Sequence, residues 1–226
     1  MSKSENQEKP KKEKEIIEYN GIVFDSLDEM YFYWWCEEAK ENGLLVDFKF
    51  HPQPFVLSEP MRFDRYEEGK VKSFKKIGTI TLGRKIVYQS DFLLIFTQLA
   101  LDKKLLGMVE PTENFGKIYC GKKSDYHFLG HERTGFPYAI NDVKPAIKQA
   151  YNGISSKRDF GIKRAFLLKE HGLYVNETVV INQQNPGDCL FSVTFAPKKY
   201  LYRPRLDGKG YYKIYCEEKT IEDYMK

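Results

Sequence analysis

The sequence has no apolar run approaching the roughly 18 residues that would span a bilayer, and its Lys/Glu-rich N-terminus has no hydrophobic stretch behind it. These absences predict neither a transmembrane helix nor a secretory signal, no membrane partner, and a cytoplasmic location. Only four cysteines are present among 226 residues, and no two of them form a CxxC pair. Their wide spacing disfavours a disulfide framework and a zinc knuckle, so reduced thiols are expected.

The cysteines and histidines give little indication of a zinc site or of a nucleophilic catalytic triad. Cys120 lies near His127 and His131 in the sequence, and all three are residue types that ligate zinc. A fourth ligand at a suitable spacing is missing, so scattered loop and core residues are the favoured interpretation of this group. No histidine is paired with a serine or cysteine in a pattern that suggests a nucleophilic triad.

Apolar and aromatic residues, in contrast, are abundant. The chain is 42% hydrophobic and 15% aromatic, with 16 Tyr and 16 Phe, which is enough to bury a sizeable core and excludes wholesale disorder. Residues 1–15 differ from the rest, because they contain five Lys and four Glu and no apolar residue beyond the initiator Met. Such a segment cannot bury enough surface to offset its ordering entropy, so we expect a flexible tail.

The net charge of +4 is unevenly distributed. Residues 62–85 carry eight Lys or Arg against three acids, residues 144–169 carry seven against one, and residues 198–213 carry six against one. Each segment also contains Phe or Tyr, which can stack on bases or pack in a core. Concentrated basic surface attracts polyanions through counterion release, although for any single segment a solvated Lys-rich face is the favoured interpretation.

The first predicted elements are a hairpin and a helix. Asn20-Gly21 is typical of a tight hairpin turn. Ser26 is a suitable N-cap, and Glu29 three residues later completes a capping-box pattern before a strongly apolar helix over residues 27–42.

The middle of the chain is rich in strand-forming residues. Residues 44–58, 73–83 and 84–98 contain many Val, Ile, Phe and Tyr with turn residues between them. A basic linker containing Gly69 separates the first two segments. We expect these strands to form a meander.

Residues 99–135 are punctuated by glycine and are interpreted as an insertion or long hairpin between two core strands. The second of these core strands lies within residues 135–146. It is followed by a helix over about residues 157–171 with an apolar stripe of Phe160, Ala165, Phe166, Leu167 and Leu168. Beyond it we expect strands over residues 173–182 and 189–197, a hairpin around Asp207-Gly208 and a short closing helix. The order of elements indicates a mixed α/β fold.

Three residues of this pattern have the chemistry of a metal-dependent hydrolase. Asp142 and Lys144 lie two positions apart in a predicted strand, so both project to one face while Val143 packs into the core. A carboxylate in that position can hold a divalent cation, and the neighbouring ammonium can orient or activate a water. Asp91, at the start of the apolar run before the insertion, would supply a second carboxylate for Mg²⁺, which prefers oxygen ligands.

These residues resemble the PD-(D/E)XK nuclease superfamily, whose signature is an acid at the first core strands followed by an acid-X-Lys triplet on the next strand. Here the pair is QSDF, with Asp91, and DVK, with Asp142 and Lys144. The additional helical acid of the family matches Glu29 in FDSLDEMYF, which is similar to the F-x-S-x-x-E pattern that opens the first helix in many phage and prokaryotic members. The resemblance covers about residues 20–182.

The resemblance implies a restriction-endonuclease-like α/β core, with a central mixed sheet flanked by the Glu29 helix and the helix over residues 157–171. A glycine-rich insertion and a C-terminal β extension would be attached to this core. The division that follows is a disordered tail (1–15), a nuclease-like domain (16–182, with the insertion at 99–135) and a C-terminal β extension (183–226).

The resemblance also implies Mg²⁺-dependent endonucleolytic hydrolysis of phosphodiester bonds in DNA, with Mn²⁺ as a substitute cation. Asp91 and Asp142 would ligate the metal, and Glu29 would complete the metal site directly or through water. Lys144 would position the attacking water and the scissile phosphate. The expected DNA contacts are basic residues of the later helix: Lys157, Arg158, Lys163 and Arg164. Of these, Lys163 and Arg164 in FGIKRAF are similar to the helical basic residues of Holliday junction resolvases and related phage endonucleases.

The sequence departs from the family pattern at two points. Ser90 stands before Asp91 where the signature often has proline, and 51 residues separate Asp91 from Asp142, which requires the insertion to leave the sheet. Taken singly, Glu29 is also explained as a capping acid, Asp91 as a turn residue, and the Asp142 triplet as an exposed strand-edge pair.

The biological context implied by the resemblance is phage or mobile-element DNA processing, including branched junctions, in the host cytoplasm or on a virion. A homodimer and a phage assembly partner are both open. Two alternatives remain: a non-catalytic DNA-binding or virion-associated protein that retains the nuclease fold, and an interaction module that uses the aromatic C-terminal strands.

Overall fold

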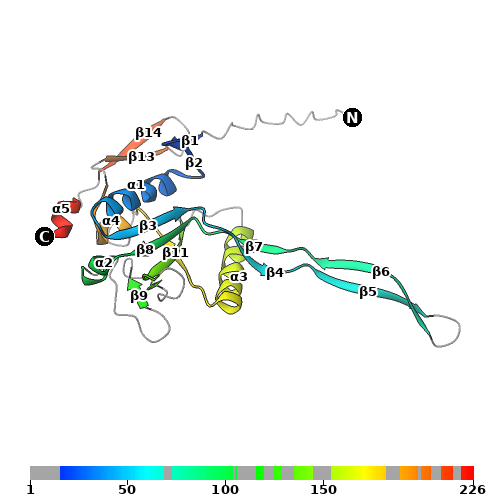
Figure 1. The fold of residues 1–226 in the computed structure, drawn as a ribbon. Helices are drawn as coiled ribbons and strands as arrows, with labels where there is room; N and C mark the ends of the chain where they lie inside the picture. Colours follow the sequence, from blue (N-terminus) through cyan, green and yellow to red (C-terminus); the bar gives the residue numbers. More distant parts are fainter. Residues whose placement is uncertain are drawn as a thin grey trace, which may run out of the picture.

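The fold is built around a four-stranded mixed sheet in the order β12-β11-β8-β3 (Figure 1). β8 runs antiparallel to both β3 and β11, whereas β12 is parallel to β11. The strands are β3 (Leu45–Phe50), β8 (Phe92–Phe96), β11 (Tyr138–Val143) and β12 (Val175–Thr178). This computed structural model describes residues 16–68, 73–103, 105, 116–119, 125–128, 135–144, 154–181, 189–197, 200–204, 210–215 and 220–226.

Helix α1 (Leu27–Glu41) covers one face of the sheet. Alternate residues of a strand point to opposite faces, and in β8 the residues that meet α1 are Phe92, Leu94 and Phe96. α1 packs three fully buried aromatic side chains into the same core: Tyr31, Phe32 and Trp35.

The predicted hairpin and helix start are confirmed. β1 (Ile17–Tyr19) pairs with β2 (Ile22–Phe24), and the turn residues Asn20 and Gly21 have φ values of 51° and 76°. Two successive positive φ angles are what a type I′ hairpin turn requires, and Asn-Gly adopts them readily. Ser26 caps α1 by accepting a hydrogen bond from the Glu29 backbone N–H.

Helix α3 (Ile154–His171) lies on the other face of the sheet, where fully buried Leu167 packs with Ile140 and Val175. The apolar stripe predicted for this helix is wrong, because Phe166 and Leu168 are exposed. A helix with 3.6 residues per turn cannot turn three consecutive residues inward, so only the face containing Phe160 and Leu167 meets the sheet.

The meander predicted for residues 44–98 is also wrong. β3 pairs with β8 and not with the strand that follows it, and the chain between them forms one long hairpin that projects from the body (Figure 1). Residues 61–68, which the sequence suggested to be part of a basic linker, form a strand of this hairpin. We call residues 55–88 the arm; its strands are β4 (Phe55–Ser58) paired with β7 (Ile86–Tyr88), and β5 (Met61–Glu68) paired with β6 (Phe74–Gly83).

The long gap between β8 and β11 does not separate them in space. Ile95 pairs with Tyr138, so the residues between the two strands leave the sheet and return, as predicted. The excursion begins with α2 (Gln98–Asp102), and Ala100 and Leu105 are fully buried in the core that contains α1. A hairpin of β9 (Gly116–Tyr119) and β10 (Asp125–Phe128) belongs to the same excursion.

The C-terminal residues complete the main core. The strand predicted over residues 189–197 is wrong, because α4 (Leu190–Val193) forms there, with Cys189 and Ser192 capping each other. The predicted hairpin and closing helix are confirmed as β13 (Tyr200–Pro204), β14 (Tyr211–Tyr215) and α5 (Ile221–Met225). The apolar side chains that join the α1 core are Leu190, Phe191, Phe195, Leu201 and Ile221.

Several sequence predictions concern residues that the structure leaves outside its described part. These are the tail over residues 1–15, Cys120, Cys216 and His131. Cys36 and Cys189 are buried free thiols, as the expected reduced state requires. Among the described residues, no helix combines the length and apolar character needed to cross a lipid bilayer.

Candidate active site

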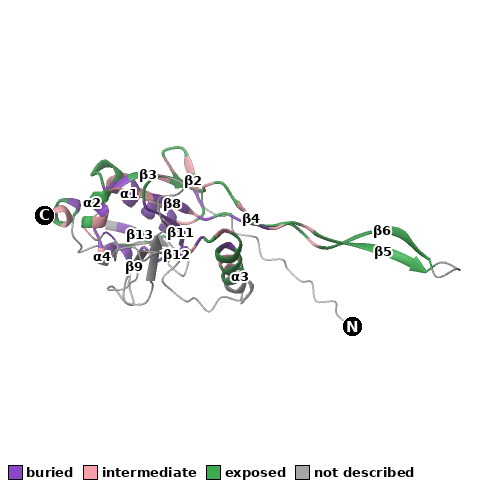
Figure 2. Cartoon of the chain, turned by 60° about the horizontal axis from the view of Figure 1, so that its bottom comes forward, coloured by how far each residue is buried: buried purple, intermediate pink, exposed green. Residues whose placement is uncertain are grey.

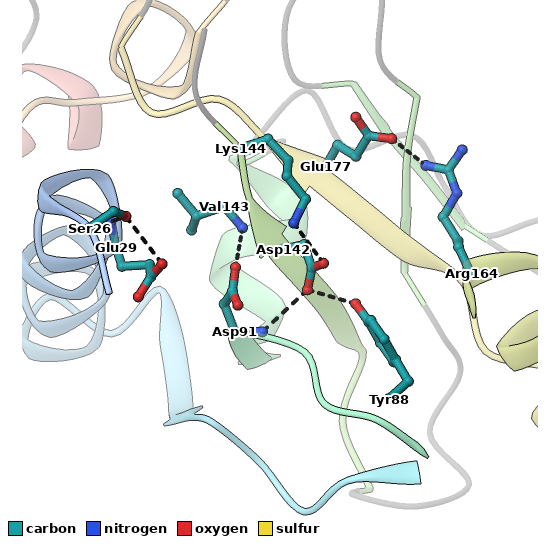
Figure 3. Close-up of polar contacts among 9 residues, drawn as sticks. All are labelled: Ser26, Glu29, Tyr88, Asp91, Asp142, Val143, Lys144, Arg164 and Glu177. Atoms are coloured by element: carbon teal, nitrogen blue, oxygen red, sulfur yellow. Dashed lines mark hydrogen bonds and ion pairs between the residues drawn. The ribbon is translucent and has the colours of Figure 1, made fainter. Parts of the chain in front are cut away.

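Asp91 and Asp142 meet where β8 begins and β11 ends (Figure 3). The Val143 backbone N–H donates a 2.7 Å hydrogen bond to Asp91 Oδ2, and the Asp91 backbone N–H donates a 3.3 Å bond to Asp142 Oδ1. Each acid is therefore held by the backbone of the other strand. The antiparallel pairing of β8 with β11 brings together two residues that are 51 positions apart in the sequence.

Asp142 is fixed by two further donors. It is 4% exposed, and the Tyr88 hydroxyl donates a 2.6 Å bond to its Oδ1 while Lys144 Nζ donates a 2.9 Å bond to its Oδ2. Val143 points to the opposite face and packs in the α1 core, as the spacing of the triplet predicted. Lys144 Nζ also lies 4.5 Å from the centre of the Phe160 ring of α3. The ammonium is thus positioned by a carboxylate and by an aromatic face.

Tyr88 is a site residue that the sequence interpretation missed. It ends β7 at the base of the arm, three positions before Asp91, and it is buried. Burial and the nearby Asp142 carboxylate raise the pKa of the Tyr88 hydroxyl, so it remains a hydrogen-bond donor at neutral pH. Tyr88 lies close to Asp91 in the sequence. However, a tyrosine at the end of an apolar strand is common, so the sequence alone does not identify it as a site residue.

The electrostatics of the pair favour a cation. Burial, and next the negative charge of Asp142, raise the pKa of the Asp91 carboxyl to about 7. Lys144 and the Val143 N–H act in the opposite direction, and Glu29 adds to the repulsion. Two carboxylates held this close cannot both ionise freely without a positive partner.

Glu29 lies in the first turn of α1 and is also buried. Its Oε2 accepts a 3.0 Å bond from the Asp25 backbone N–H, and its Oε1 accepts a 3.1 Å bond from the Ser26 hydroxyl. The N-cap role of Ser26 is therefore confirmed, but the Glu29 carboxylate binds the backbone N–H of Asp25 and not that of Ser26, as the predicted capping box would require. Glu29 is close enough to interact electrostatically with Asp91 and Lys144, and burial raises the pKa of its carboxyl. Glu29 can therefore stabilise the start of α1 and also lie beside Asp91 and Asp142.

A second group of ligand types adjoins Glu29. One ligand atom each from Asp25, Glu29 and His51 lies within 4.8 Å of the others. The His51 backbone N–H donates a 2.8 Å bond to the Asp91 carbonyl, which ties this group to the acid pair. Carboxylate and imidazole donors are suited to Mn²⁺ or Mg²⁺ with retained waters, so the residues around Glu29 fit a divalent cation chemically.

The basic residues of α3 are not equivalent. Arg164 forms a 2.8 Å ion pair with Glu177 of β12, and its guanidinium lies over the rings of Phe160 and Tyr174 at 5.5 and 5.4 Å. Arg164 therefore has partners within the protein, and its contact with DNA stays a prediction. Lys163 is half-buried, and the side chains of Lys157 and Arg158 lie outside the described residues.

Ser90, the residue at the position where the nuclease signature often has proline, is fully buried. Its hydroxyl has no hydrogen-bond partner among the described residues. A side chain without hydrogen-bonding groups would satisfy this position at least as well. The departure from the signature at Ser90 therefore leaves the placement of Asp91 unchanged.

Comparison with models of known protein families, with curated protein sequences and with solved structures finds no match. The functional conclusion therefore depends on the geometry of the site. That geometry brings together all four predicted catalytic residues: Glu29, Asp91, Asp142 and Lys144.

Proposed function

We propose that the protein is a metal-dependent endonuclease that hydrolyses phosphodiester bonds in DNA. The observation that carries the proposal is the mutual backbone bonding of Asp91 and Asp142, with Lys144 bonded to the same carboxylate. The order of helix, antiparallel strands, helix and parallel strand supports the restriction-endonuclease-like core that the sequence motifs imply.

The acid pair provides the donor set for a divalent cation. Asp91 Oδ1 accepts no hydrogen bond from the described part of the chain, and burial and the charge of Asp142 raise the pKa of this carboxyl, so a bound cation would stabilise its ionised form. Asp91 and Asp142 would hold Mg²⁺, and Glu29 would complete the site directly or through water. When bound, Mg²⁺ stabilises charge developing on a phosphate and lowers the pKa of a coordinated water.

Lys144 supplies the positive group on the substrate side. Its side chain is half-buried, and the Asp142 carboxylate and the Phe160 ring fix its Nζ. An ammonium fixed in this way can donate hydrogen bonds to a water and to a phosphate oxygen without a large loss of side-chain entropy. Tyr88 holds Asp142 in the orientation that Lys144 needs.

DNA is the proposed substrate because the basic segments that the sequence concentrates in residues 144–169 include Lys144 and α3, beside the acids. Processing of phage or mobile-element DNA, with branched junctions among the substrates, is the context implied by the motifs. A DNA-binding protein that retains the site without catalysis is the second candidate.

The test is cleavage of supercoiled plasmid in Mg²⁺ by the wild type and by the variants Asp142→Asn and Lys144→Ala. We expect each substitution to reduce the rate by at least about 100-fold, because both groups act on the transition state. Asp47→Asn is the matched control: it removes an acid and its 2.7 Å ion pair with Lys40 from the neighbouring strand β3, away from the acid pair.

Affinity for the same DNA should change by less than about threefold in both active-site variants, because phosphate contacts elsewhere supply most of it. Cleavage by Asp142→Asn at the wild-type rate would contradict the assigned site. A wild-type protein that binds DNA but does not cut any tested form in Mg²⁺ or Mn²⁺ would support the non-catalytic alternative.

A further inference from the structure

The outer part of the arm is a two-stranded ribbon that is open to solvent on both faces. Every residue of β5, and every residue of β6 except the last, is exposed, and the ribbon extends away from the body (Figure 2). A two-stranded hairpin without a third strand or a helix packed on it is marginally stable in water. A partner that contacts the ribbon would therefore add packing that the described part of the chain does not supply.

The charge of the ribbon is complementary to a polyanion. Residues 62–85 carry eight Lys or Arg against three acids. One of these acids is already compensated, because Asp64 Oδ1 accepts a 2.9 Å bond from the Thr79 hydroxyl and contacts Lys76 Nζ at 2.8 Å. The exposed cations that form no ion pair within the described part of the chain are Arg62, Arg65, Lys75 and Arg84. These cations are available to neutralise phosphates.

The free cations lie on both faces of the ribbon. Residues directly opposite one another on paired strands share a face, and successive residues of a strand alternate between faces. Arg62 is opposite Thr81 and lies on the same face as Asp64, whereas Arg65 lies on the other face with Phe63. A flat partner would contact only one of these faces. A groove with negatively charged walls would contact both.

The dimensions of the ribbon match a groove of duplex DNA. β6 has ten residues, so at about 3.3 Å per residue it is about 30 Å long, close to the roughly 34 Å of one turn of B-DNA. The major groove is about 12 Å wide and admits a two-stranded ribbon. Phe63 and Ile80 are exposed opposite each other, and apolar side chains of this kind can contact the thymine methyl groups on the floor of that groove.

The base of the arm is attached to the candidate active site. Tyr88, the last residue of the arm, donates a 2.6 Å bond to Asp142. The next residue, Gln89, donates bonds of 3.1 and 3.0 Å from Nε2 to the carbonyls of His51 and Pro52, which joins the two chain segments at the base. DNA that is bound along the ribbon would therefore be connected to the acid pair through a short, hydrogen-bonded path.

We propose that the β5–β6 ribbon binds in the major groove of duplex DNA that flanks the phosphodiester to be cut. The inference rests on the proposed function for the choice of DNA as partner. It adds a second contact surface, separate from α3, and assigns affinity and positioning to the ribbon while the chemistry stays with the acid pair. The contacts are mainly to phosphates, so the ribbon lowers the dissociation constant for duplex DNA of any sequence.

The test is binding of the full-length protein to a duplex of about 40 base pairs, roughly four helical turns. Fluorescence anisotropy in EDTA at several salt concentrations measures it without metal-dependent cleavage. Arg62→Gln and Arg65→Gln should each lower the salt slope by about one unit, and the double variant by about two, because each substitution removes one phosphate contact. Both side chains are exposed, so neither substitution disturbs the core.

The matched control is the double variant Lys40→Gln with Lys226→Gln. It removes the same charge as the double arm variant, from exposed side chains of α1 and the C-terminus, and should leave the slope unchanged. Equal slopes in the wild type, Arg62→Gln and Arg65→Gln would overturn the proposal. A lower slope in only one of the two arm variants would also overturn it, because it would show a partner that contacts a single face.

A shortened arm gives a second measurement. Replacing residues 61–83 with a short turn leaves β4 paired with β7 and keeps the bond from Tyr88 to Asp142. Saturating wild-type protein should protect guanine N7, which lies in the major groove, from dimethyl sulfate, and the shortened protein should protect fewer guanines. Equal protection by the two proteins would contradict binding in the major groove.

The two proposals fail in different ways. Wild-type protein that cuts plasmid in Mg²⁺, with the same salt slope in every arm variant, would overturn the role of the ribbon and leave the nuclease function standing. Wild-type protein that shows the expected slopes but cuts no DNA in Mg²⁺ or Mn²⁺ would support the ribbon as a DNA-binding surface and contradict the nuclease function.

Discussion

At the scale of single residues, burial raises the pKa of two acids of the site, Asp91 and Glu29. Asp91 is buried beside Asp142, and its carboxyl has a pKa of about 7, raised from the ordinary 3.8. Between these two values the unfolded chain has released the Asp91 proton while the folded protein still holds it. In the absence of metal, Asp91 therefore makes stability fall as the pH rises from about 4 to about 7.

This linkage predicts the effect of Asp91→Asn in EDTA. The substitution should leave the free energy of unfolding nearly unchanged at pH 4 and should raise it by on the order of 1–3 kcal/mol at pH 8, because asparagine carries no charge to repel Asp142. Urea unfolding at both pH values measures the difference. The control Asp47→Asn, which alters a carboxyl whose pKa is lowered by Lys40, should give no gain at pH 8. Equal effects of Asp91→Asn at pH 4 and pH 8 would contradict the coupling of the two acids.

At the scale of elements, two adjacent basic residues of α3 have different surroundings. Arg164 faces Glu177 of β12, whereas Lys163, one residue away, has no ion pair among the described residues. Adjacent residues on a helix point about 100° apart, so only one of the two can serve the ion pair.

We therefore expect Lys163→Ala and Arg164→Ala to act on different properties. Lys163→Ala should reduce the salt dependence of DNA binding by about one unit, as one lost phosphate contact does. Arg164→Ala should leave that slope unchanged and lower the free energy of unfolding by about 0.5–1 kcal/mol, the range of an exposed ion pair with aromatic contacts. The double variant Arg164→Ala with Glu177→Gln should cost no more than Arg164→Ala alone. A lower slope in Arg164→Ala would show that the ion pair opens on DNA.

Local sequence patterns predicted where turns and helices begin better than they predicted which strands pair with each other. The Asn20-Gly21 turn and the Ser26–Glu29 cap depend on residues within four positions of one another, so the sequence was sufficient to predict them. The acid-X-Lys triplet was equally local. The pairing of β3 with β8 depends on which distant strands meet, and alternation of apolar residues is the same in a meander and in a projecting arm. For this reason the arm, and Tyr88 at its base, could not be predicted.

At the scale of the whole molecule, the core combines side chains from α1, the excursion after β8 and the C-terminal residues. The Trp35 indole N–H donates a 3.0 Å bond to the Thr194 hydroxyl, and the Tyr31 hydroxyl donates to the Tyr202 carbonyl. These bonds join α1 to the C-terminal residues, beyond position 182. Ala100 and Leu105 likewise make the first part of the glycine-rich excursion a component of the core.

Two nested deletions test this assignment. Replacing residues 106–134 with a short glycine-containing turn should preserve cooperative melting, because Ile95 and Tyr138 remain paired and loop length costs little closure entropy. Extending the deletion to residues 99–134 removes Ala100 and Leu105 and should cost at least a further ~3 kcal/mol. Thermal melting followed by circular dichroism compares them. Equal melting temperatures would show that the two buried side chains contribute little.

The proposed nuclease function requires that Asp91 and Asp142 share one cation. Titration of the metal-free protein with Mn²⁺, followed by calorimetry at pH 7.5, measures this directly. We predict saturable binding by the wild type and at least about 10-fold weaker binding by Asp91→Asn and by Asp142→Asn, with Asp47→Asn unchanged. Binding that is equally tight in the wild type and in both active-site variants, or no binding to the wild type, would contradict the proposed metal site and the nuclease function derived from it.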